Sequence, residues 1–488
     1  MRTNHLSLAI IGLLICITSS AAPRLTVAVV VDGMRQESLD QLRPYWQQGG
    51  LRTLSEEAYQ TTIRFPHIVY GGSECVATMM TGTTPSVHGI AADSYFLRSD
   101  RRPHAILEDK SEQGVGCSAA LSPRNLLAAT IGDELRMRHG ERAHIYALGL
   151  DPSTSILMAG HAADGCCWLD GSTAQWVSTT YYGKQIPQAL ATWNEGIRRQ
   201  ELMARTWTPR LDIDLYSTPT EQERKKGFSY TTTELLNTPM ANTMVIESAL
   251  ALQKHEHLGE DNIPDLLCLH LTTRSPKATT DQLCSAEQED MYLWLNQDLG
   301  YLIDQLAHVV GVQHLRVVIM GRPLLGQNIA ALSAARLPSQ YFNIDRAAAL
   351  TGTYLMALYG TERWVDGGYG QSIYLNRTLI EQKHMSLPQL QQQVAAFLMD
   401  FEGVAAAFPF TEALGSVALA NTVNKRGFGD VVFTLQPHWL LKANDHEVLD
   451  HVIDIDPIVP LMIWSGSYQA FPTGITDATQ IKDLIIER

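Results

Sequence analysis

The stretch Arg24–Arg35, RLTVAVVVDGMR, determines the fold class of this chain. From Leu25 to Val31 it is apolar and largely β-branched, and it is too short to cross a membrane. Such a run is typical of a strand buried on both faces of a parallel sheet. Asp32 follows at the carboxyl end of this strand, where open α/β sheets place their ligands. Position alone leaves two roles open for Asp32, a metal ligand and a helix cap.

Buried strands and amphipathic helices alternate along the rest of the chain. Apolar runs predict further strands at 144–150, 265–271, 315–320 and 458–464, and a strand region at 422–435. Helical spacing predicts helices at 36–59, 73–80, 122–138, 287–310, 347–359 and 387–401. The alternation predicts one α/β domain, 23–488, with a mostly parallel central sheet flanked by helices. Residues 168–233 lack strong periodicity and are interpreted as an inserted cap over the sheet.

The first 22 residues have the pattern of a secretory signal peptide. Arg2 and His5 precede an apolar run, 6–17, and small residues follow it at 18–22. We therefore expect an exported protein of the periplasm or cell surface, with no transmembrane segment after the signal peptide. The net charge of -14 and the absence of a basic block argue against a nucleic-acid partner. Export permits disulfides, and the adjacent pair Cys166 and Cys167 suggests one bridged and one buried cysteine.

A second informative stretch is Phe65–Ile90, FPHIVYGGSECVATMMTGTTPSVHGI. Gly71 and Gly72 precede the helix predicted to begin at Ser73. The free N–H groups of that helix would face the carboxyl edge of the sheet, which favours an anion site or a nucleophile. Ser73 and Glu74 are equally explained as a helix cap and a first-turn acid.

Several blocks of this sequence together resemble the alkaline phosphatase superfamily. They are VVVDGMR, TGTTPSVHGI, SPRNLLAATIGDELR, AGHAADGCCWLD with STTYY, TERWVDGGYGQSIYLN, VNKRGFGDVVFTLQPHW and VPLMIWSG, in this order. In particular, the chain is similar to the secreted, phosphate-irrepressible alkaline phosphatases of the Bacteroidota type, which are relatives of the nucleotide pyrophosphatase/phosphodiesterases. The resemblance covers nearly the whole chain after residue 25. It implies that family's fold and, in active members, two zinc ions at the sheet edge.

The resemblance also assigns catalytic roles to particular positions of this chain. Asp32 matches the zinc-binding aspartate of the first strand. The nucleophile position falls on Gly72, which has no side-chain oxygen, and Ser73 is one residue away. The phosphate-binding asparagine position falls on Asp93. The two phosphate-binding cations fall on Asp151 and Ser153, an acid and a hydroxyl.

The remaining zinc-ligand positions are also altered. After the predicted strand 265–271 the chain reads TTRSPKATT, without Asp or His. After 315–320 it has Arg322 and Pro323 where the family has an Asp-His pair, and the last histidine position is Ile458, with His446 and His451 nearby. Of the expected zinc ligands only Asp32 remains. Since a zinc site needs about three to four protein ligands, Asp32 is interpreted as a vestigial ligand. We therefore expect no catalytic residue, no phosphate-binding residue and no cofactor.

The leading hypothesis is an exported pseudoenzyme that acts as a binding or scaffold subunit, with another envelope protein as its partner. The alternative is a phosphatase or phosphodiesterase with a rebuilt acidic site of Asp32, Glu74, Asp93 and Asp151, whose oxygens suit Ca²⁺, Mg²⁺ or Mn²⁺. Against this alternative, some of these acids are expected to pair with arginines instead; the candidates are Arg35, Arg124 and Arg322. A third hypothesis is a glycan binder that uses aromatic residues of the cap; these are Trp168, Trp176, Tyr181 and Tyr182.

Overall fold

The computed structural model describes residues 23–278, 285–323, 340–413, 415–423, 428–443, 458–466 and 477–486, with residues 336 and 474. The expected signal peptide, His446 and His451 lie outside the described residues. No helix in the described part of the chain is both long and apolar enough to cross a membrane.

The strand β1 (Leu25–Asp32) lies near the centre of a nine-stranded sheet with the order β2-β17-β10-β1-β9-β6-β7-β8-β5. All of its residues are buried, as its composition predicts. Its neighbours β10 (Leu315–Arg322) and β9 (Asp265–Thr272) run parallel to it. The other strands are β2 (Tyr59–Arg64), β5 (Gly114–Val115), β6 (Ile145–Gly149), β7 (Gly165–Leu169), β8 (Trp176–Thr179) and β17 (Ile458–Ser465). Strands pair in parallel from β10 to β7 and antiparallel toward both ends, which confirms the predicted α/β class.

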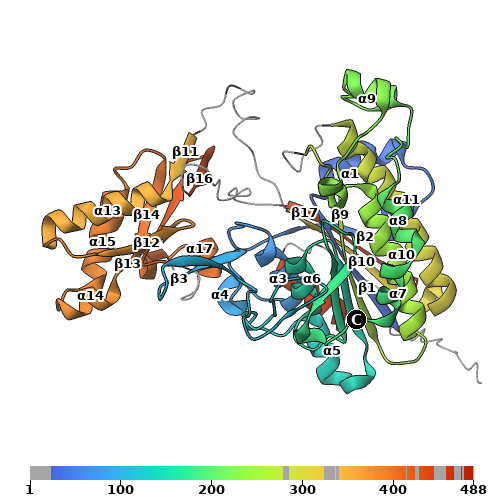
Figure 1. Ribbon diagram of the computed structural model, residues 1–488, viewed down its shortest axis with the longest axis horizontal. Helices are drawn as coiled ribbons and strands as arrows, with labels where there is room; N and C mark the ends of the chain where they lie inside the picture. Colours follow the sequence, from blue (N-terminus) through green and yellow to red (C-terminus); the bar gives the residue numbers. More distant parts are fainter. Residues whose placement is uncertain are drawn as a thin grey trace, which may run out of the picture.

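Helices cover both faces of this sheet (Figure 1). Successive side chains of β1 point to opposite faces and therefore belong to two different cores. Val27, Val29 and Val31 belong to the core with α10 (Pro239–Glu256) and α11 (Ala286–Val310). Also on this face are α1 (Gln36–Leu42), α2 (Gly50–Glu57), α7 (Gln188–Glu195) and α8 (Ile197–Met203). Ala28 and Val30 belong to the opposite core, with α3 (Ser73–Thr81), α5 (Ile131–His139), α6 (Pro152–Ala159) and α18 (Ile481–Ile486).

Three predicted elements have wrong boundaries. The helix predicted at 36–59 is divided by a 3-10 turn, Arg43–Tyr45, which contains Pro44. The helix predicted at 122–138 begins only at Ile131, because Thr130 and Asp133 form a reciprocal capping box there, whereas the Ser122 hydroxyl bonds to Asp109. The strand region predicted at 422–435 begins only at β15 (Val431–Leu435).

The segment 168–233 combines sheet strands with a layer over the helices. Residues 168–179 supply the end of β7 and all of β8, and later residues form α7, α8 and α9 (Glu221–Lys226). The buried carboxylate of Asp290 in α11 holds this layer: it accepts hydrogen bonds from Trp207 Nε1 at 2.6 Å, from the Arg210 N–H at 2.7 Å and from the Tyr216 hydroxyl. Trp168 and Trp176 are 4% and 1% exposed, so core packing accounts for both and they offer no glycan-stacking surface.

A small subdomain, residues 340–443, lies to one side of the main sheet in Figure 1 and has a core of its own. Its four-stranded sheet has the order β12-β13-β15-β14. The strands besides β15 are β12 (Val365–Tyr369), β13 (Ser372–Leu375) and β14 (Val404–Pro409), and a separate parallel pair is β11 (Gln340–Asn343) with β16 (Trp439–Lys442). The helices are α13 (Ile344–Tyr359), α14 (Arg377–Gln382), α15 (Leu387–Leu398), α16 (Phe410–Ala413) and α17 (Val417–Thr422).

A hairpin from the main body, β3 (Ser94–Leu97) with β4 (Arg102–Ala105), joins the small subdomain. Arg98 donates to the fully buried carboxylate of Asp430 at 2.8 Å and to the Leu375 carbonyl at 2.9 Å. The rings of Phe96 and Tyr374 lie 4.4 Å apart. These contacts fix the hairpin against the small subdomain.

The adjacent cysteines Cys166 and Cys167 are both free and both buried, so the predicted bridge is wrong. They are consecutive residues of β7, and consecutive side chains of a strand point to opposite faces. Cys166 lies in the core of α3 and α6, and Cys167 in the core of α10 and α11. The sheet therefore separates the two thiols.

Candidate functional site

Charged side chains from several elements meet at the carboxyl edge of the main sheet. Asp32 ends β1 and Arg322 ends β10, and the parallel register places these two residues directly opposite each other. His270 lies near the end of β9, and Asp151 follows β6 as the N-cap of α6. In parallel strands, residues in register point to the same face, so the fold itself brings Asp32 and Arg322 together.

The centre of the site is a buried ion pair between Asp32 and Arg322. Arg322 Nε lies 2.5 Å from Asp32 Oδ1, and Nη2 lies 2.7 Å from Oδ2, which is a bidentate arrangement. Arg322 Nη1 donates to Thr154 Oγ1 at 2.7 Å. Asp32 and Arg322 are only 5% and 4% exposed. This contact confirms the expectation that an arginine pairs with an acid of the proposed acidic cluster.

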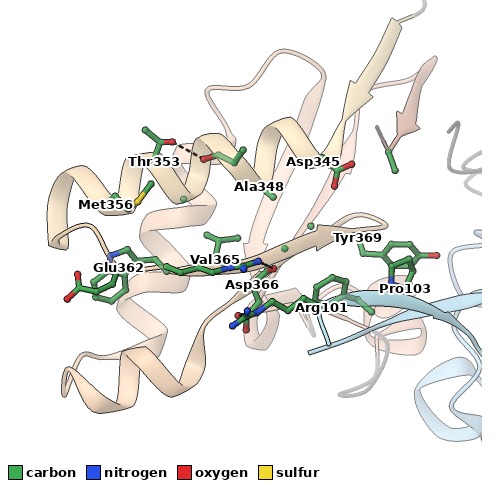
Figure 2. A pocket seen from close by; sticks show the side chains of 18 of the residues that line it. Arg101, Pro103, Asp345, Ala348, Thr353, Met356, Glu362, Val365, Asp366 and Tyr369 are labelled. Carbon is green, nitrogen blue, oxygen red and sulfur yellow. Dashed lines mark hydrogen bonds and ion pairs between the residues drawn. The ribbon is translucent and has the colours of Figure 1, made fainter. Parts of the chain in front are cut away.

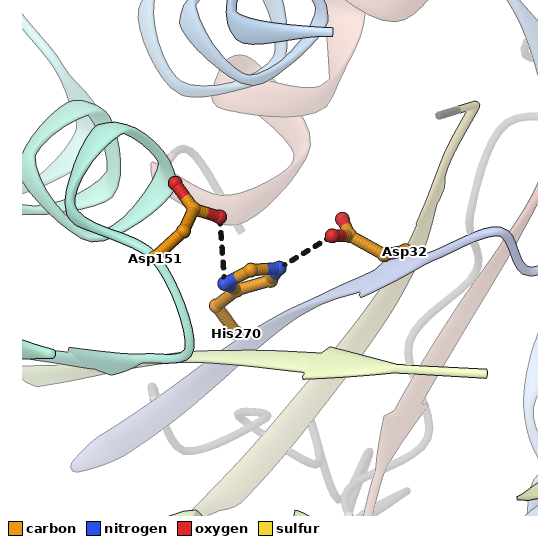
Figure 3. A group of neighbouring side chains, drawn as sticks. All are labelled: Asp32, Asp151 and His270. Carbon is orange, nitrogen blue, oxygen red and sulfur yellow. Dashed lines mark ion pairs between the residues drawn. The ribbon is translucent and has the colours of Figure 1, made fainter. Parts of the chain in front are cut away.

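The imidazole of His270 lies between Asp32 and Asp151 (Figure 3). Its Nε2 is 2.9 Å from Asp32 Oδ2, and its Nδ1 is 3.2 Å from Asp151 Oδ2. Asp151 also accepts hydrogen bonds from the backbone N–H and hydroxyl of Thr154, both at 2.8 Å, and lies 3.6 Å from Arg322 Nη2. Asp151 thus has a structural role as a helix cap besides its contact with His270.

The charges of this group stabilise one another. Burial alone would raise the pKa of Asp32, but the positive charge and hydrogen bonds of Arg322, together with the adjacent His270 imidazole, hold it well below the usual range. Burial would lower the pKa of Arg322, but Asp32 and Asp151 raise it further above its ordinary value. Both members of the pair are therefore ionised throughout the physiological pH range.

The loop before α3 forms an anion-binding concavity, and the side chain of Glu74 occupies it. Glu74 Oε1 accepts hydrogen bonds from the backbone N–H groups of Tyr70 and, at 3.0 Å, Gly71; Oε2 accepts from the Gly72 N–H at 3.1 Å. These three N–H groups belong to the loop, whereas the predicted anion site was made of the free N–H groups of the helix that begins at Ser73. Burial and the nearby Asp93 raise the pKa of Glu74 to about 7 despite these hydrogen bonds.

The nucleophile position that the resemblance assigns is occupied by a glycine. Gly72 has a φ of 96°, a left-handed conformation that favours glycine, and a Cβ built there would lie 3.6 Å from Arg322 Cδ. Ser73 is 1% exposed and its hydroxyl bonds to the carboxylate of Asp93, whose pKa is raised chiefly by burial. Asp93 also crowds Gly71, since its Oδ2 is 2.4 Å from where a Gly71 Cβ would lie.

The other positions expected from the resemblance have structural roles. Thr273, after β9, donates its hydroxyl to the Asp32 carbonyl at 2.9 Å. Ser153 is half-buried in the first turn of α6, and Ile458 begins β17 with its side chain partly exposed. Arg124 pairs with Asp109 and Glu112, away from the acidic cluster.

The donor set does not fit the two zinc ions that the resemblance implies. Asp32, Asp151 and His270 do place three donor atoms within 4.8 Å of one another, which is a possible site for one ion. However, both oxygens of Asp32 are bound to the Arg322 guanidinium, which also lies 3.6 Å from Asp151. A second set of about three to four ligands is not found among the described residues. The guanidinium supplies the positive charge that a metal ion would supply.

Sequence reasoning identified Asp32, Asp151 and Arg322 but missed His270 and Thr154. His270 lies near the carboxyl end of the largely apolar strand β9, DLLCLHLT, whereas the resemblance placed the zinc ligands after that strand. A polar side chain within a strand that is buried on both faces needs hydrogen-bonding or ionic partners. The histidine in this strand was therefore the signal that could have placed His270 in the site.

The sequence and the fold are those of a known class of proteins. Residues 26–322 match the profile of the family "Type I phosphodiesterase / nucleotide pyrophosphatase". The chain belongs to this family, and with it to the alkaline phosphatase superfamily that the sequence motifs indicated.

Particular relatives agree with this assignment. The chain is 25% identical over 404 residues to alkaline phosphatase PafA of Elizabethkingia meningoseptica, covering 76% of this chain and 72% of that protein. It is 24% identical over 469 residues to a protein of Myroides odoratus named calcium-transporting ATPase, covering 88% and 84%. The crystal structure of wild-type PafA superposes with a TM-score of 0.82 at 23% identity over 96% of both chains, which establishes the shared fold. A phosphonoacetate hydrolase of Sinorhizobium meliloti superposes with a TM-score of 0.56 at 13% identity over 95% of this chain and 96% of that one.

Proposed function

We propose that this protein is an exported, non-hydrolytic member of the family that acts as a binding or scaffold subunit in the cell envelope. The observation that carries the proposal is the bidentate pair of Arg322 with Asp32, which uses both oxygens of the one retained zinc-ligand position. A buried carboxylate held in this way can bind a metal only if a guanidinium leaves, and a buried ion pair separates at high cost.

Two further features support the absence of hydrolysis. Gly72 has no nucleophilic atom, and the neighbouring Ser73 hydroxyl is bonded to Asp93. The backbone N–H groups of Gly71 and Gly72, at and beside the nucleophile position, are bound to the Glu74 carboxylate. Loss of an oxyanion donor alone reduces rates by about a hundred- to a thousand-fold, and here the nucleophile position is lost as well.

The test is elemental analysis of natively purified protein together with hydrolysis of aryl phosphates and phosphodiesters. We expect no stoichiometric zinc, and a rate equal to that of an Asp32→Ala variant. Two zinc ions per chain, or hydrolysis well above that of the variant, would refute the proposal.

One observation favours a second candidate function, a phosphatase or phosphodiesterase that uses a single divalent cation. Asp32, Asp151 and His270 are close enough to share an ion, although Glu74 and Asp93 are engaged elsewhere. In this case Mn²⁺ or Ca²⁺ would raise the melting temperature of the wild-type protein, and the shift would disappear in Asp32→Ala and His270→Ala variants.

A further inference from the structure

A groove of about 820 Å³ lies between the hairpin β3–β4 and the small subdomain (Figure 2). Asp32, Asp151, His270 and Arg322 are not among the residues that line it. One wall is α13, the other is the hairpin, and β12 runs between them. We call this the edge groove. Its volume is within the range of about 300–1,000 Å³ that is usual for binding pockets.

The α13 wall presents a stripe of uncharged side chains. They recur at spacings of three and four residues, as one face of a helix requires, and are Ala348, Ala349, Gly352, Thr353 and Met356. The stripe spans about 12 Å at about 1.5 Å per residue. This length corresponds to about four residues of extended chain.

The strand β12 is the terminal strand of its sheet among the described strands. Both of its faces are covered at its two glycines. A Cβ at Gly367 would lie 2.8 Å from Phe96 of the hairpin, and one at Gly368 would lie 2.8 Å from Ile344 of α13. What remains toward the groove is the backbone edge of the strand, which has the hydrogen-bonding pattern that another strand recognises. Glycine within a strand also marks positions where a second backbone approaches closely.

Part of this edge is already covered. Arg363 donates from Nε to the Val365 carbonyl at 3.2 Å and from Nη2 to the Asp366 carbonyl at 3.0 Å. A positive side chain on the edge of a sheet limits indiscriminate pairing. The portion of β12 beyond Asp366, which contains both glycines, is not covered by this guanidinium.

The charges around the groove are largely neutralised within the protein. Arg101 on the hairpin wall lies 3.0 Å from Asp366, and Glu362 is paired with Lys383. Two further charged residues line the groove: Arg363, which donates to backbone carbonyls, and Asp345 at the start of α13, which has an interaction partner of its own. With Lys383 counted, the three positive side chains (Arg101, Arg363 and Lys383) balance the three negative ones (Asp345, Glu362 and Asp366). A charged occupant would lose its hydration without meeting a net counter-charge, so the groove is complementary to an uncharged one.

We propose that the edge groove binds an uncharged, extended segment of a partner polypeptide, which adds a short strand to the edge of β12. This inference rests on the proposed binding function and names the surface that performs it. The hairpin and the subdomain are held together by Arg98 and Asp430, so both walls are in place before binding.

The test uses the full mature chain and a fluorescein-labelled hexapeptide of alternating Val and Ser, measured by fluorescence anisotropy. The blocking variant is Gly352→Leu, because a Cβ at Gly352 has only ordinary contact with Val365, at 3.9 Å, and the larger side chain extends into the groove. The matched control is Ala357→Leu, an exposed position of the same helix that does not line the groove. Melting temperatures of both variants establish that they are folded.

We expect the peptide to bind the wild type and Ala357→Leu equally, and to bind Gly352→Leu at least tenfold more weakly. The same peptide with a central Val replaced by Pro should also bind at least tenfold more weakly, because proline removes a backbone donor. Absence of binding, equal binding to Gly352→Leu, or tighter binding of a version with two Ser replaced by Lys or Asp would overturn the proposal. The zinc and hydrolysis assays are independent of these variants. Failed peptide binding with no zinc would therefore reject the groove alone, and stoichiometric zinc would reject the proposed function alone.

Discussion

Replacing Arg322 by alanine tests the proposed role of the buried ion pair most directly. In the wild type, both oxygens of Asp32 are bound to Arg322, at 2.5 and 2.7 Å, and Oδ2 also lies 2.9 Å from His270 Nε2. Removing one partner of a buried pair leaves an uncompensated charge and costs about 3–5 kcal/mol. We therefore expect Arg322→Ala to lower the free energy of unfolding by about this amount at pH 7, measured by urea denaturation.

The pH dependence distinguishes this loss from a simple loss of packing. In the wild type the pKa of Asp32 is below its ordinary value, so the stabilisation is complete above about pH 4 and is lost as the pH falls further. In the variant, burial without the guanidinium raises the pKa of Asp32, so protonation relieves the cost as the pH falls. The difference in stability between the two proteins should therefore narrow from pH 7 toward pH 4.

The double variant Asp32→Asn/Arg322→Met is the control, because replacing both partners of a buried pair is often close to neutral. It should recover most of the lost stability at pH 7. A deficit of less than about 1 kcal/mol for Arg322→Ala, or a deficit that is the same at pH 7 and pH 4, would show that the pair is not a buried, coupled charge pair.

Three further predictions concern the same regions. Arg322→Ala should gain a Mn²⁺ site made of Asp32, Asp151 and His270. At a Mn²⁺ concentration one hundred times the Kd, the ion should raise the free energy of unfolding of the variant by about 2.7 kcal/mol, measured by calorimetry, and should leave that of the wild type unchanged. The pKa of Glu74 is raised from 4.5 to about 7, so the stability of the wild type relative to Glu74→Gln should fall by about 3 kcal/mol as the pH rises across that interval, measured by urea titrations. A difference in stability between the two proteins that does not change with pH would contradict the burial of an ionising Glu74. In Asp290, Oδ1 accepts from Arg210 and Tyr216, and Oδ2 accepts from Trp207. Asp290→Asn replaces one of these two acceptors by a donor NH₂ group, so it should cost about 1–3 kcal/mol and speed proteolysis of the segment 207–216; unchanged cleavage would show that Asp290 does not hold this layer.

The predicted strands around β1 were confirmed because each is a short apolar run that only a doubly buried position can accommodate. Arg322 was one of three arginines expected to pair with the acidic positions, and the parallel register of β1 and β10 is what places it opposite Asp32. The hydrogen bonds of Glu74 were beyond prediction, because they depend on the path of the Tyr70–Gly72 backbone and not on residue type.

The small subdomain was also beyond the reach of the sequence pattern. Its edge strand reads VDGGY, which lacks the alternation and β-branched content of a typical strand. The contact that fixes it to the main body joins Arg98 and Asp430, which are 332 residues apart. Such a pairing has no local signature, so neither the subdomain nor the groove beside it could be inferred from spacing.

The place of β17 in the main sheet has a consequence for how the chain acquires its structure. This strand comes from the end of the sequence, yet it lies between β10 and β2, pairing Met462 with Gln60 and with Ile319. During synthesis β2 is made early and has no neighbour in the sheet until about four hundred more residues have followed, while one side of the buried strand β10 stays open. Unpaired strand edges of this kind favour aggregation. The nascent protein therefore depends on its last strand to close the sheet, and a chain that ends before residue 458 would present that open apolar edge to other chains.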